Sequence, residues 1–339
     1  MYKSLPSFIL SRGSSQISKV RLVMQRILNN LMKGIVLSLL LSLSAMAESS
    51  IDEFTKQEIP ASGKGVPKVV LSGNQVKNIQ YAEVDDKPLL LDLYLPEKPE
   101  GSPLVIWVHG GGWKGGSKQN CFVKWLSNFG YTVASINYRL VDVAKWPAQL
   151  HDCKGAIRWL RANAQTYGYN PDCVIAAGAS AGGHLVALLG TTGGSEELEG
   201  NVGGNDEQSS RVQAVVDYYG ATDFPLRSRT QSWKVNKPGS VVYNLLGGPA
   251  NTLVEKAKQA SAKFHVTSDD SPLLVFHGVK DTTVLINQTD ALEEAYKKHN
   301  LPVTVYRLKD AGHGGFVFYS AENAAHLCEF LETVCSAKE

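Results

Sequence analysis

The sequence lacks the marks of a non-globular chain or of a small cross-linked one. It has 14 prolines, 31 glycines and five cysteines among 339 residues, and 43% of its residues are hydrophobic. This composition excludes a disordered chain, a collagen-like repeat and a small disulfide-stapled scaffold. The net charge is only +2, which gives no reason to expect a nucleic-acid partner. A chain of this length can bury a large core as one or two domains.

Acidic residues are missing from the first 47 positions, which carry six basic side chains. The other residues have 28 basic against 32 acidic side chains, a net charge of −4. An apolar run of nine residues, IVLSLLLSL at 35–43, follows Lys33 and precedes Ala45-Met46-Ala47. This order of a basic segment, a short apolar segment and small residues predicts a signal peptide over 1–47.

A cleaved signal peptide implies export to the periplasm or the extracellular space after cleavage near Ala47. Nine apolar residues are too few to cross about 30 Å of hydrocarbon, so no stable membrane anchor is expected. The basic segment is unusually long. We therefore expect that translation starts at Met32 or Met24.

Metal-binding cysteine and histidine motifs are also missing. The sequence has no CxxC pair and no HExxH motif, so no metal site is expected. The cysteines are compatible with disulfides in an exported protein, although an odd number leaves at least one thiol unpaired. Buried thiols are the alternative for each of them. The five are Cys121, Cys153, Cys173, Cys328 and Cys335.

Strand-like and helix-like segments alternate along most of the chain. Residues 48–75 are polar and irregular and predict a linker or surface arm, whereas residues 76–335 predict one catalytic domain. The strand-like runs cover residues 76–83, 89–95, 104–109, 132–136, 174–177, 212–218, 273–277 and 303–308. The helix-like stretches cover residues 122–129, 149–166, 182–189, 253–263, 289–299 and 321–333.

This alternation predicts an α/β fold with a mostly parallel eight-stranded sheet and helices on both faces. The first two strand-like runs are separated only by a turn-like DDKP, so we expect an antiparallel hairpin at one edge. Two stretches, 191–210 and 224–249, interrupt the pattern. Both are too long for ordinary connections and predict functional loops over one end of the sheet.

A serine lies between a strand-like and a helix-like segment. The sequence GASAG at 178–182 follows the apolar run CVIAA and opens a helical stretch. A GxSxG motif in this context predicts a nucleophile elbow, in which small residues allow a sharp turn that exposes the serine hydroxyl. A plain glycine-rich turn is the alternative.

A second glycine-rich motif, HGGGW at 109–113, follows the apolar run LVIWV. Three glycines let the backbone turn so that N–H groups point into a cavity. Together with the N–H of Ala181, these donors would stabilise the oxyanion of a tetrahedral intermediate. A phosphate-binding loop is the alternative, but no Lys-Ser/Thr follows at the required spacing. His109 is interpreted as structural.

A serine nucleophile needs a base and an acid, which in this fold class follow the serine in the order Asp, then His. Asp281 follows the run LLVFH and His313 follows VTVYRL. Both lie just after strand-like runs, where α/β sheets place their sites. Asp310 is the rival acid, although its position suggests a role in loop structure. His277 is interpreted as core packing, and His184 lies on the helix after the serine.

The four motifs HGGGW, GASAGGH, HGVKD and AGHGG together resemble an α/β-hydrolase esterase. More narrowly, residues from about 80 to 335 resemble the secreted bifunctional carbohydrate/feruloyl esterase-like (BD-FAE-like) group, near the hormone-sensitive-lipase-like esterases. Further segments that support the narrower resemblance are INYRL, WPAQLHDCKGAIRWLRANA, YGATDF, LLGG and VTSDDSPLLVFHG.

The resemblance implies Ser180 as nucleophile, Asp281 as acid and His313 as base. It also implies an oxyanion hole formed by the N–H groups of three residues and a pocket near two more. The oxyanion-hole residues are Gly111, Gly112 and Ala181, and the pocket residues are Trp113 and Asp223, the latter with a helix cap as its alternative role.

The expected activity is hydrolysis of short-chain carboxylic esters through an acyl-enzyme, without a metal or organic cofactor. No long helical cap precedes the HGGG motif, so long-chain lipid esters are not the expected substrates. The resemblance favours acetyl or feruloyl esters of plant-type polysaccharides, and the expected partner is thus a small-molecule or polysaccharide ester. A peptidase or formamidase on the same fold is the alternative enzyme. A catalytically silent binding protein is the alternative outside enzymes.

Overall fold

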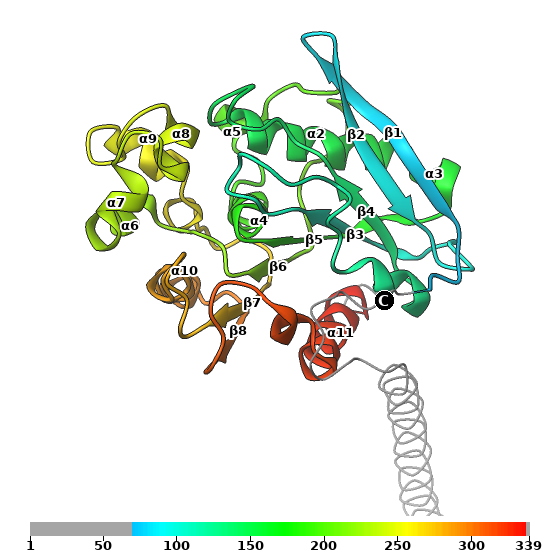
Figure 1. The fold of residues 1–339 in the computed structure, drawn as a ribbon. Coiled ribbons are helices and arrows are strands. Elements are labelled where there is room, and N and C mark those ends of the chain that lie inside the picture. The colour runs from blue at the N-terminus through cyan, green and yellow to red at the C-terminus, as the bar shows by residue number, and fades with distance from the viewer. Residues whose placement is uncertain (1–69, 337–339) are drawn as a thin grey trace, which may run out of the picture. The chain divides into compact units, whose positions relative to one another are not determined.

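The computed structural model describes residues 70–336, and these belong to one compact unit. The predicted signal peptide and most of the predicted arm lie outside the described residues. The unit is built on one eight-stranded sheet (Figure 1). Its strands are β1 (Gln75–Val84), β2 (Lys87–Tyr94), β3 (Pro103–Val108), β4 (Thr132–Ile136), β5 (Asn170–Ala179), β6 (Ala214–Tyr218), β7 (Leu273–Gly278) and β8 (Val303–Leu308).

The strand order across the sheet is β1-β2-β4-β3-β5-β6-β7-β8. The hairpin of β1 and β2 forms one edge and pairs antiparallel with β4, and every pairing from β4 to β8 is parallel. The predicted fold class, the edge hairpin and all eight strand positions are therefore confirmed. Figure 1 shows the hairpin at one side of the sheet and β8 at the other.

The centre of the sheet forms the core. Every residue of β4, β6 and β7 is buried, and β3 and β5 are buried over most of their length. Strands buried on both faces need apolar residues at successive positions rather than at alternate ones, which explains the continuous runs LVIWV and LLVFH. The helix α4 (Ala181–Thr191) packs against β5 and β6, and all its residues are buried. It follows β5 directly and so fixes the position of the turn between them.

Helices connect the strands, although several differ from the prediction. The predicted helix over 122–129 is a 3-10 helix, and the predicted helix over 149–166 is divided into two. The bounds of the helices are α2 (Ala148–Ala162), α3 (Ala164–Tyr167), α5 (Glu196–Glu199), α6 (Phe224–Thr230), α7 (Ser232–Val235), α8 (Val241–Leu246), α9 (Val254–Gln259), α10 (Asn287–Lys298) and α11 (Ala321–Ser336), with 3-10 helices η1 (Lys124–Phe129), η2 (Ala262–Phe264) and η3 (Phe316–Tyr319).

The stretch 224–249, predicted as a loop, instead contains α6, α7 and α8. These helices have four to seven residues each, too few for an apolar repeat to be visible in the sequence. Figure 1 shows α6 to α9 gathered in one group beside the sheet. Two residues of this stretch, Arg227 and Val241, line the main cavity described below.

The other interrupting stretch, 191–210, does not cover the predicted site. It contributes no residue to the lining of the main cavity. Its Glu199 instead forms ion pairs with Lys154 and Arg158 on α2, at 2.9 Å for Lys154 Nζ. A carboxylate partner offsets part of the cost of burying a cation, and these ion pairs hold the stretch against α2. The stretch 191–210 therefore does not contribute to the cavity at the predicted site, whereas 224–249 does.

Four of the five cysteines lie in the described part of the chain and form no disulfide there. Three of them are buried, as in the alternative interpretation of buried thiols. The side chain of Cys335 lies outside the description. No helix within residues 70–336 combines the length and hydropathy that a membrane span requires.

Candidate active site

Ser180 lies in a tight turn between β5 and α4. Its backbone has φ 55° and ψ −111°, a conformation that L-residues rarely adopt. Its neighbours must be small because the turn brings backbone segments together: a Cβ on Gly178 would lie 2.6 Å from the carbonyl oxygen of Gly182. A Cβ on Gly182 would lie 2.0 Å from that of Val108. The turn therefore has the geometry of a nucleophile elbow.

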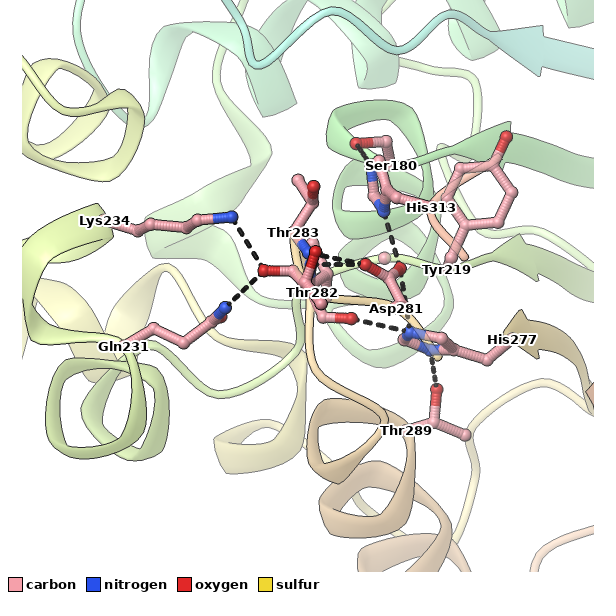
Figure 2. A network of polar contacts seen from close by, with 12 residues as sticks. Ser180, Tyr219, Gln231, Lys234, His277, Asp281, Thr282, Thr283, Thr289 and His313 are labelled. Carbon is pink, nitrogen blue, oxygen red and sulfur yellow. Dashed lines mark hydrogen bonds and ion pairs between the residues drawn. The ribbon is translucent and has the colours of Figure 1, made fainter. Parts of the chain in front are cut away.

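The predicted base and acid lie in line with this serine. Ser180 Oγ is 2.8 Å from His313 Nε2, and His313 Nδ1 is 2.6 Å from Asp281 Oδ2. Figure 2 shows the imidazole of His313 between the serine and the carboxylate. Three residues that are far apart in the sequence thus form one chain of hydrogen bonds.

Asp281 is buried and surrounded by hydrogen-bond donors. The backbone N–H groups of Thr283 and Val284 donate to its Oδ1 at 2.7 and 2.9 Å. Burial alone would raise the pKa of Asp281, but the hydrogen bonds from His277 and His313 outweigh it and hold that pKa well below its usual range. The carboxylate therefore stays ionised next to His313.

His277 has more contacts than its interpretation as core packing implied. Its Nε2 lies 3.3 Å from Asp281 Oδ2 and 2.9 Å from the carbonyl oxygen of Val284. Its Nδ1 lies 2.6 Å from Thr289 Oγ1 on α10. Figure 2 shows His277 on the side of Asp281 away from Ser180. The spacing HGVKD, with histidine four residues before the acid, was the signal for this contact.

Three side chains from α6, α7 and the residue between them hold the loop that follows Asp281. Gln231 Nε2 and Lys234 Nζ donate to the carbonyl oxygen of Thr282 at 3.0 and 2.8 Å. Arg227 Nη2 donates to the carbonyl oxygen of Thr283 at 2.7 Å. Figure 2 shows Gln231 and Lys234 converging on Thr282. None of these three side chains was predicted from the sequence.

Asp310, the rival acid, lies at the surface. Its Oδ1 forms an ion pair with Lys280 Nζ at 2.6 Å, and both side chains are mostly exposed. His313 contacts Asp281 instead, and Asp281 is the acid that the sequence favoured.

The glycine-rich loop 109–113 follows β3 and lies beside Ser180. Gly111 and Gly112 have φ of 116° and 60°, which favour glycine. A Cβ on Gly111 would lie 2.2 Å from the carbonyl oxygen of Gly115. His109 stacks on Tyr138, with ring centroids 4.4 Å apart, and Tyr138 Oη donates to the carbonyl oxygen of His109 at 3.0 Å. These contacts fit the interpretation of His109 as structural.

A cavity of about 560 Å³ opens at Ser180. Its wall includes the three residues predicted for the oxyanion hole. Ala181 is the first residue of α4, where backbone N–H groups have no partner within the helix. Whether these N–H groups bind an oxyanion stays a prediction. The lining residues used below are Gly111, Gly112, Trp113, Lys114, Asn120, Phe122, Ser180, Ala181, Tyr219, Arg227, Thr283 and His313.

The two predicted pocket residues differ in outcome. Trp113 lines the cavity, as expected. Asp223 does not, and its prediction as a pocket residue is wrong. Its Oδ1 accepts the N–H of Leu226 at 2.8 Å and so caps α6, while its Oδ2 pairs with Lys263 Nζ at 3.0 Å. The helix cap, the alternative role, is the one that the structure shows.

Within residues 70–336, no three histidine, cysteine, aspartate or glutamate side chains are grouped so that they could hold a metal ion. The polar groups around Ser180 are those of acyl-transfer chemistry. A hydroxyl, an imidazole and a helix N-terminus lie at the cavity wall, and an ionised carboxylate lies behind the imidazole.

Several relatives in sequence are named esterases. Esterase LipC of Mycobacterium tuberculosis is 32% identical over 239 residues, which is 68% of this chain and 58% of LipC. Esterase LipQ of the same organism is 30% identical over 270 residues, covering 73% of this chain and 56% of LipQ. The chain thus spans little more than half the length of these relatives.

Solved structures show the same fold, and one segment of the sequence matches a defined family. A truncated carbohydrate esterase from gut microbiota superposes with a TM-score of 0.71 at 27% identity, covering 78% of this chain and 97% of that one. The bifunctional GH43-CE protein of Bacteroides eggerthii gives 0.70 at 30% identity, covering 76% of this chain and 35% of that one. Residues 91–296, more than half of the chain, match the BD-FAE family. With its eight-stranded sheet and nucleophile elbow, the chain therefore belongs to the BD-FAE family of α/β-hydrolases.

Proposed function

We propose that the protein is an exported serine esterase that cleaves short-chain carboxylic esters through an acyl-enzyme on Ser180. The observation that carries this proposal is the chain of contacts from Ser180 Oγ through His313 to Asp281 at the wall of the cavity. The esterase names of the relatives in sequence and structure support the same activity.

In the proposed reaction, Ser180 Oγ attacks the ester carbonyl while His313 Nε2 accepts its proton. Asp281 accepts a hydrogen bond from Nδ1–H, which fixes the tautomer of His313 and stabilises the imidazolium. The backbone N–H groups of Gly111, Gly112 and Ala181 stabilise the oxyanion. The alcohol leaves with the proton from His313, and water then attacks the acyl-enzyme in the same way.

The substrates we propose are acetyl or feruloyl esters of plant-type polysaccharides. The structural relatives include a carbohydrate esterase, which supports an ester on a sugar. The cavity wall mixes the aromatic rings of Trp113, Phe122 and Tyr219 with the polar side chains of Asn120 and Thr283. Aromatic faces beside hydrogen-bonding groups suit a sugar ring with a short or aromatic acyl group.

A serine-directed fluorophosphonate probe tests the nucleophile. It should label one peptide, the one that contains Ser180, and Ser180→Ala should remove both the label and nearly all hydrolysis of an aryl acetate. The matched control is Ser209→Ala, because Ser209 is exposed and does not line the cavity. Full labelling of the Ser180→Ala variant would refute the assignment.

A panel of esters that vary in acyl chain and alcohol tests the substrate class. We expect kcat/KM to be highest for acyl groups of two to four carbons, with release of acetate or ferulate from acylated xylan. Rates that keep rising to about ten carbons, without release from any acylated carbohydrate, would instead indicate a lipase-like enzyme. Comparison with matched amides separates the esterase from a peptidase or formamidase.

Export is part of the proposal and rests on the sequence of residues 1–47, outside the described part. The mature protein recovered outside the cytoplasm should begin at Glu48. N-terminal sequencing checks this, and an exported form that still begins at Met1 or Met32 would contradict signal cleavage.

A further inference from the structure

The charged side chains around the cavity are all basic. Its lining contains Arg227 and Lys114 but no aspartate or glutamate. The nearest acid of the site, Asp281, lies behind His313 and is engaged by it. The wall that a substrate meets is therefore positively charged.

Arg227 is the unusual member of this wall. Four lysine or arginine residues are buried in the described part of the chain. Three of them form an ion pair with a carboxylate: Lys118 with Asp92, and both Lys154 and Arg158 with Glu199. Arg227 is only 2% exposed, yet it forms no ion pair with any carboxylate of residues 70–336, unlike the other three.

The hydrogen bonds of Arg227 do not use its whole donor set. Nε donates to Gln231 Oε1 at 3.1 Å and Nη2 donates to the carbonyl oxygen of Thr283 at 2.7 Å. Nη1 has no acceptor among the described residues. Burial lowers the pKa of Arg227 to about 10, so the group stays charged at neutral pH. The Asp281 carboxylate attracts Arg227 from a distance and raises its pKa, but it forms no ion pair with the guanidinium, so the cost of burying that charge is only partly offset. Guanidinium groups also match carboxylates in geometry.

We propose that Arg227 binds a carboxylate carried by the ester substrate. This inference rests on the proposed esterase function and narrows its substrates to acidic esters. The carboxylate belongs either to the acyl group, as in a hemiester of a dicarboxylic acid, or to the alcohol, as in an ester of a uronic-acid sugar. Lys114, which is exposed on the same wall, adds long-range attraction for such an anion.

Matched ester pairs test the inference and identify the source of the carboxylate. The acyl arm compares the 4-nitrophenyl hemiester of succinate with 4-nitrophenyl butyrate, which has the same chain length without the charge. The alcohol arm compares acetylated methyl glucuronoside with acetylated methyl glucoside. In one arm, the wild type should prefer the anionic ester by at least about tenfold in kcat/KM, with most of the difference in KM. Added salt should reduce this preference.

Substitutions at Arg227 then show whether this side chain causes the preference for the anionic ester. Arg227→Gln should lower kcat/KM for both esters of the pair, because Arg227 also holds Thr283, and should lower the ratio of anionic to neutral ester by a further 10- to 100-fold. Arg227→Lys, which keeps the charge, should retain part of the ratio. Arg229→Gln is the matched control, because Arg229 is exposed on the same helix and does not line the cavity.

Two results would overturn the inference while leaving the esterase intact. One is a wild type that hydrolyses the neutral esters without preference in either arm. The other is an Arg227→Gln variant that loses activity on both esters equally, which would make Arg227 only a support for the acid loop. A wild type that hydrolyses none of the esters would refute the proposed function, and this inference with it.

Discussion

The two loops that meet at Ser180 are held in place by different means. The acid loop, residues 279–284, is held by side chains: His277 contacts the carboxylate of Asp281, and donors from α6 and α7 bind two backbone carbonyls. The glycine loop, residues 109–113, is held by its backbone conformation, with positive φ at Gly111 and Gly112. The stacked pair of His109 and Tyr138 fixes its start.

The difference follows from what each loop must present. An ionised carboxylate in a buried place needs donors around it, and only side chains and free N–H groups can supply them. The predicted oxyanion donors are themselves backbone N–H groups, and a ligand can approach them only if no side chain stands in the way. Substitutions should therefore damage the acid loop when they remove a hydrogen-bonding side chain. They should damage the glycine loop when they add a side chain to its backbone.

The largest effect is expected at the acid itself. Asp281→Asn should lower kcat by about 10⁴-fold, because the amide favours the wrong tautomer of His313. Asp310→Asn is the control and should retain most activity, since its carboxylate binds exposed Lys280. Steady-state hydrolysis of an aryl acetate measures both. If the two variants rank in the opposite order, the acid has been wrongly assigned.

The glycine loop should respond to a single added methyl group. Gly111→Ala places a Cβ 2.2 Å from the carbonyl oxygen of Gly115, so the loop must shift and the N–H groups move. We expect kcat to fall by about 100-fold, the usual cost of a lost oxyanion donor.

The matched control for the glycine loop is Gly115→Ala. A Cβ at Gly115 has no neighbour within 4 Å, so this variant should keep near wild-type rates. Equal losses in the two variants, measured by the same assay, would argue against an oxyanion hole in this loop.

His277 should have a smaller effect, because it acts on the acid rather than on the substrate. In His277→Gln, one partner of Asp281 is weakened while the backbone donors to Oδ1 remain, and kcat should fall by about tenfold with little change in KM. An unchanged kcat with a reduced melting temperature would indicate a purely structural role for His277.

The last expected effect is on folding stability rather than on activity. It concerns a second buried carboxylate, Asp217 on β6, which lacks the hydrogen-bond donors that surround Asp281. Its Oδ1 accepts the N–H of Gly220 at 2.8 Å, but its Oδ2 is buried without a partner. Burial raises the pKa of Asp217 to about 6. A raised folded-state pKa means that stability is fully present below the unfolded value of about 3.9 and is lost as the pH rises through about 6.

Asp217→Asn removes this ionisation. Relative to the wild type, its free energy of unfolding should rise by about 2 kcal/mol between pH 4 and pH 7. Urea denaturation at both pH values measures the difference. A constant difference would show that Asp217 ionises normally in the folded protein. For Asp281, whose pKa is lowered, the sign is opposite: its contribution is present above pH 4 and is lost as the pH falls.

Features that depend on a short segment could be predicted from the sequence more fully than contacts between distant segments. The elbow around Ser180 and the glycine loop were visible because close backbone approach demands small residues at fixed spacing in a short segment. The strands were visible because burial on both faces requires continuous apolar runs. Arg227 was missed because its contact with Thr283 joins segments that are 56 positions apart. Asp223 was predicted to lie at the pocket because an aspartate that caps a helix and one that lines a pocket have the same sequence pattern.

The short helices were missed for an energetic reason. A helix of four to seven residues, such as α6 or α7, is not stable by its own hydrogen bonds, and its packing decides whether it forms. The sequence of 224–249 therefore carries little helical signal, even though two of its residues, Arg227 and Val241, line the cavity.

The backbone of Ser180 has a consequence for how such a chain would change over generations. Its φ of 55° costs a residue with a side chain of the order of 1–3 kcal/mol, whereas glycine adopts that conformation freely. Under the proposed function, the hydroxyl is thus retained against folding stability by selection for hydrolysis. In a duplicated copy released from that selection, substitution by glycine at position 180 would be favoured by stability, so glycine there would mark a descendant that has lost the proposed hydrolysis.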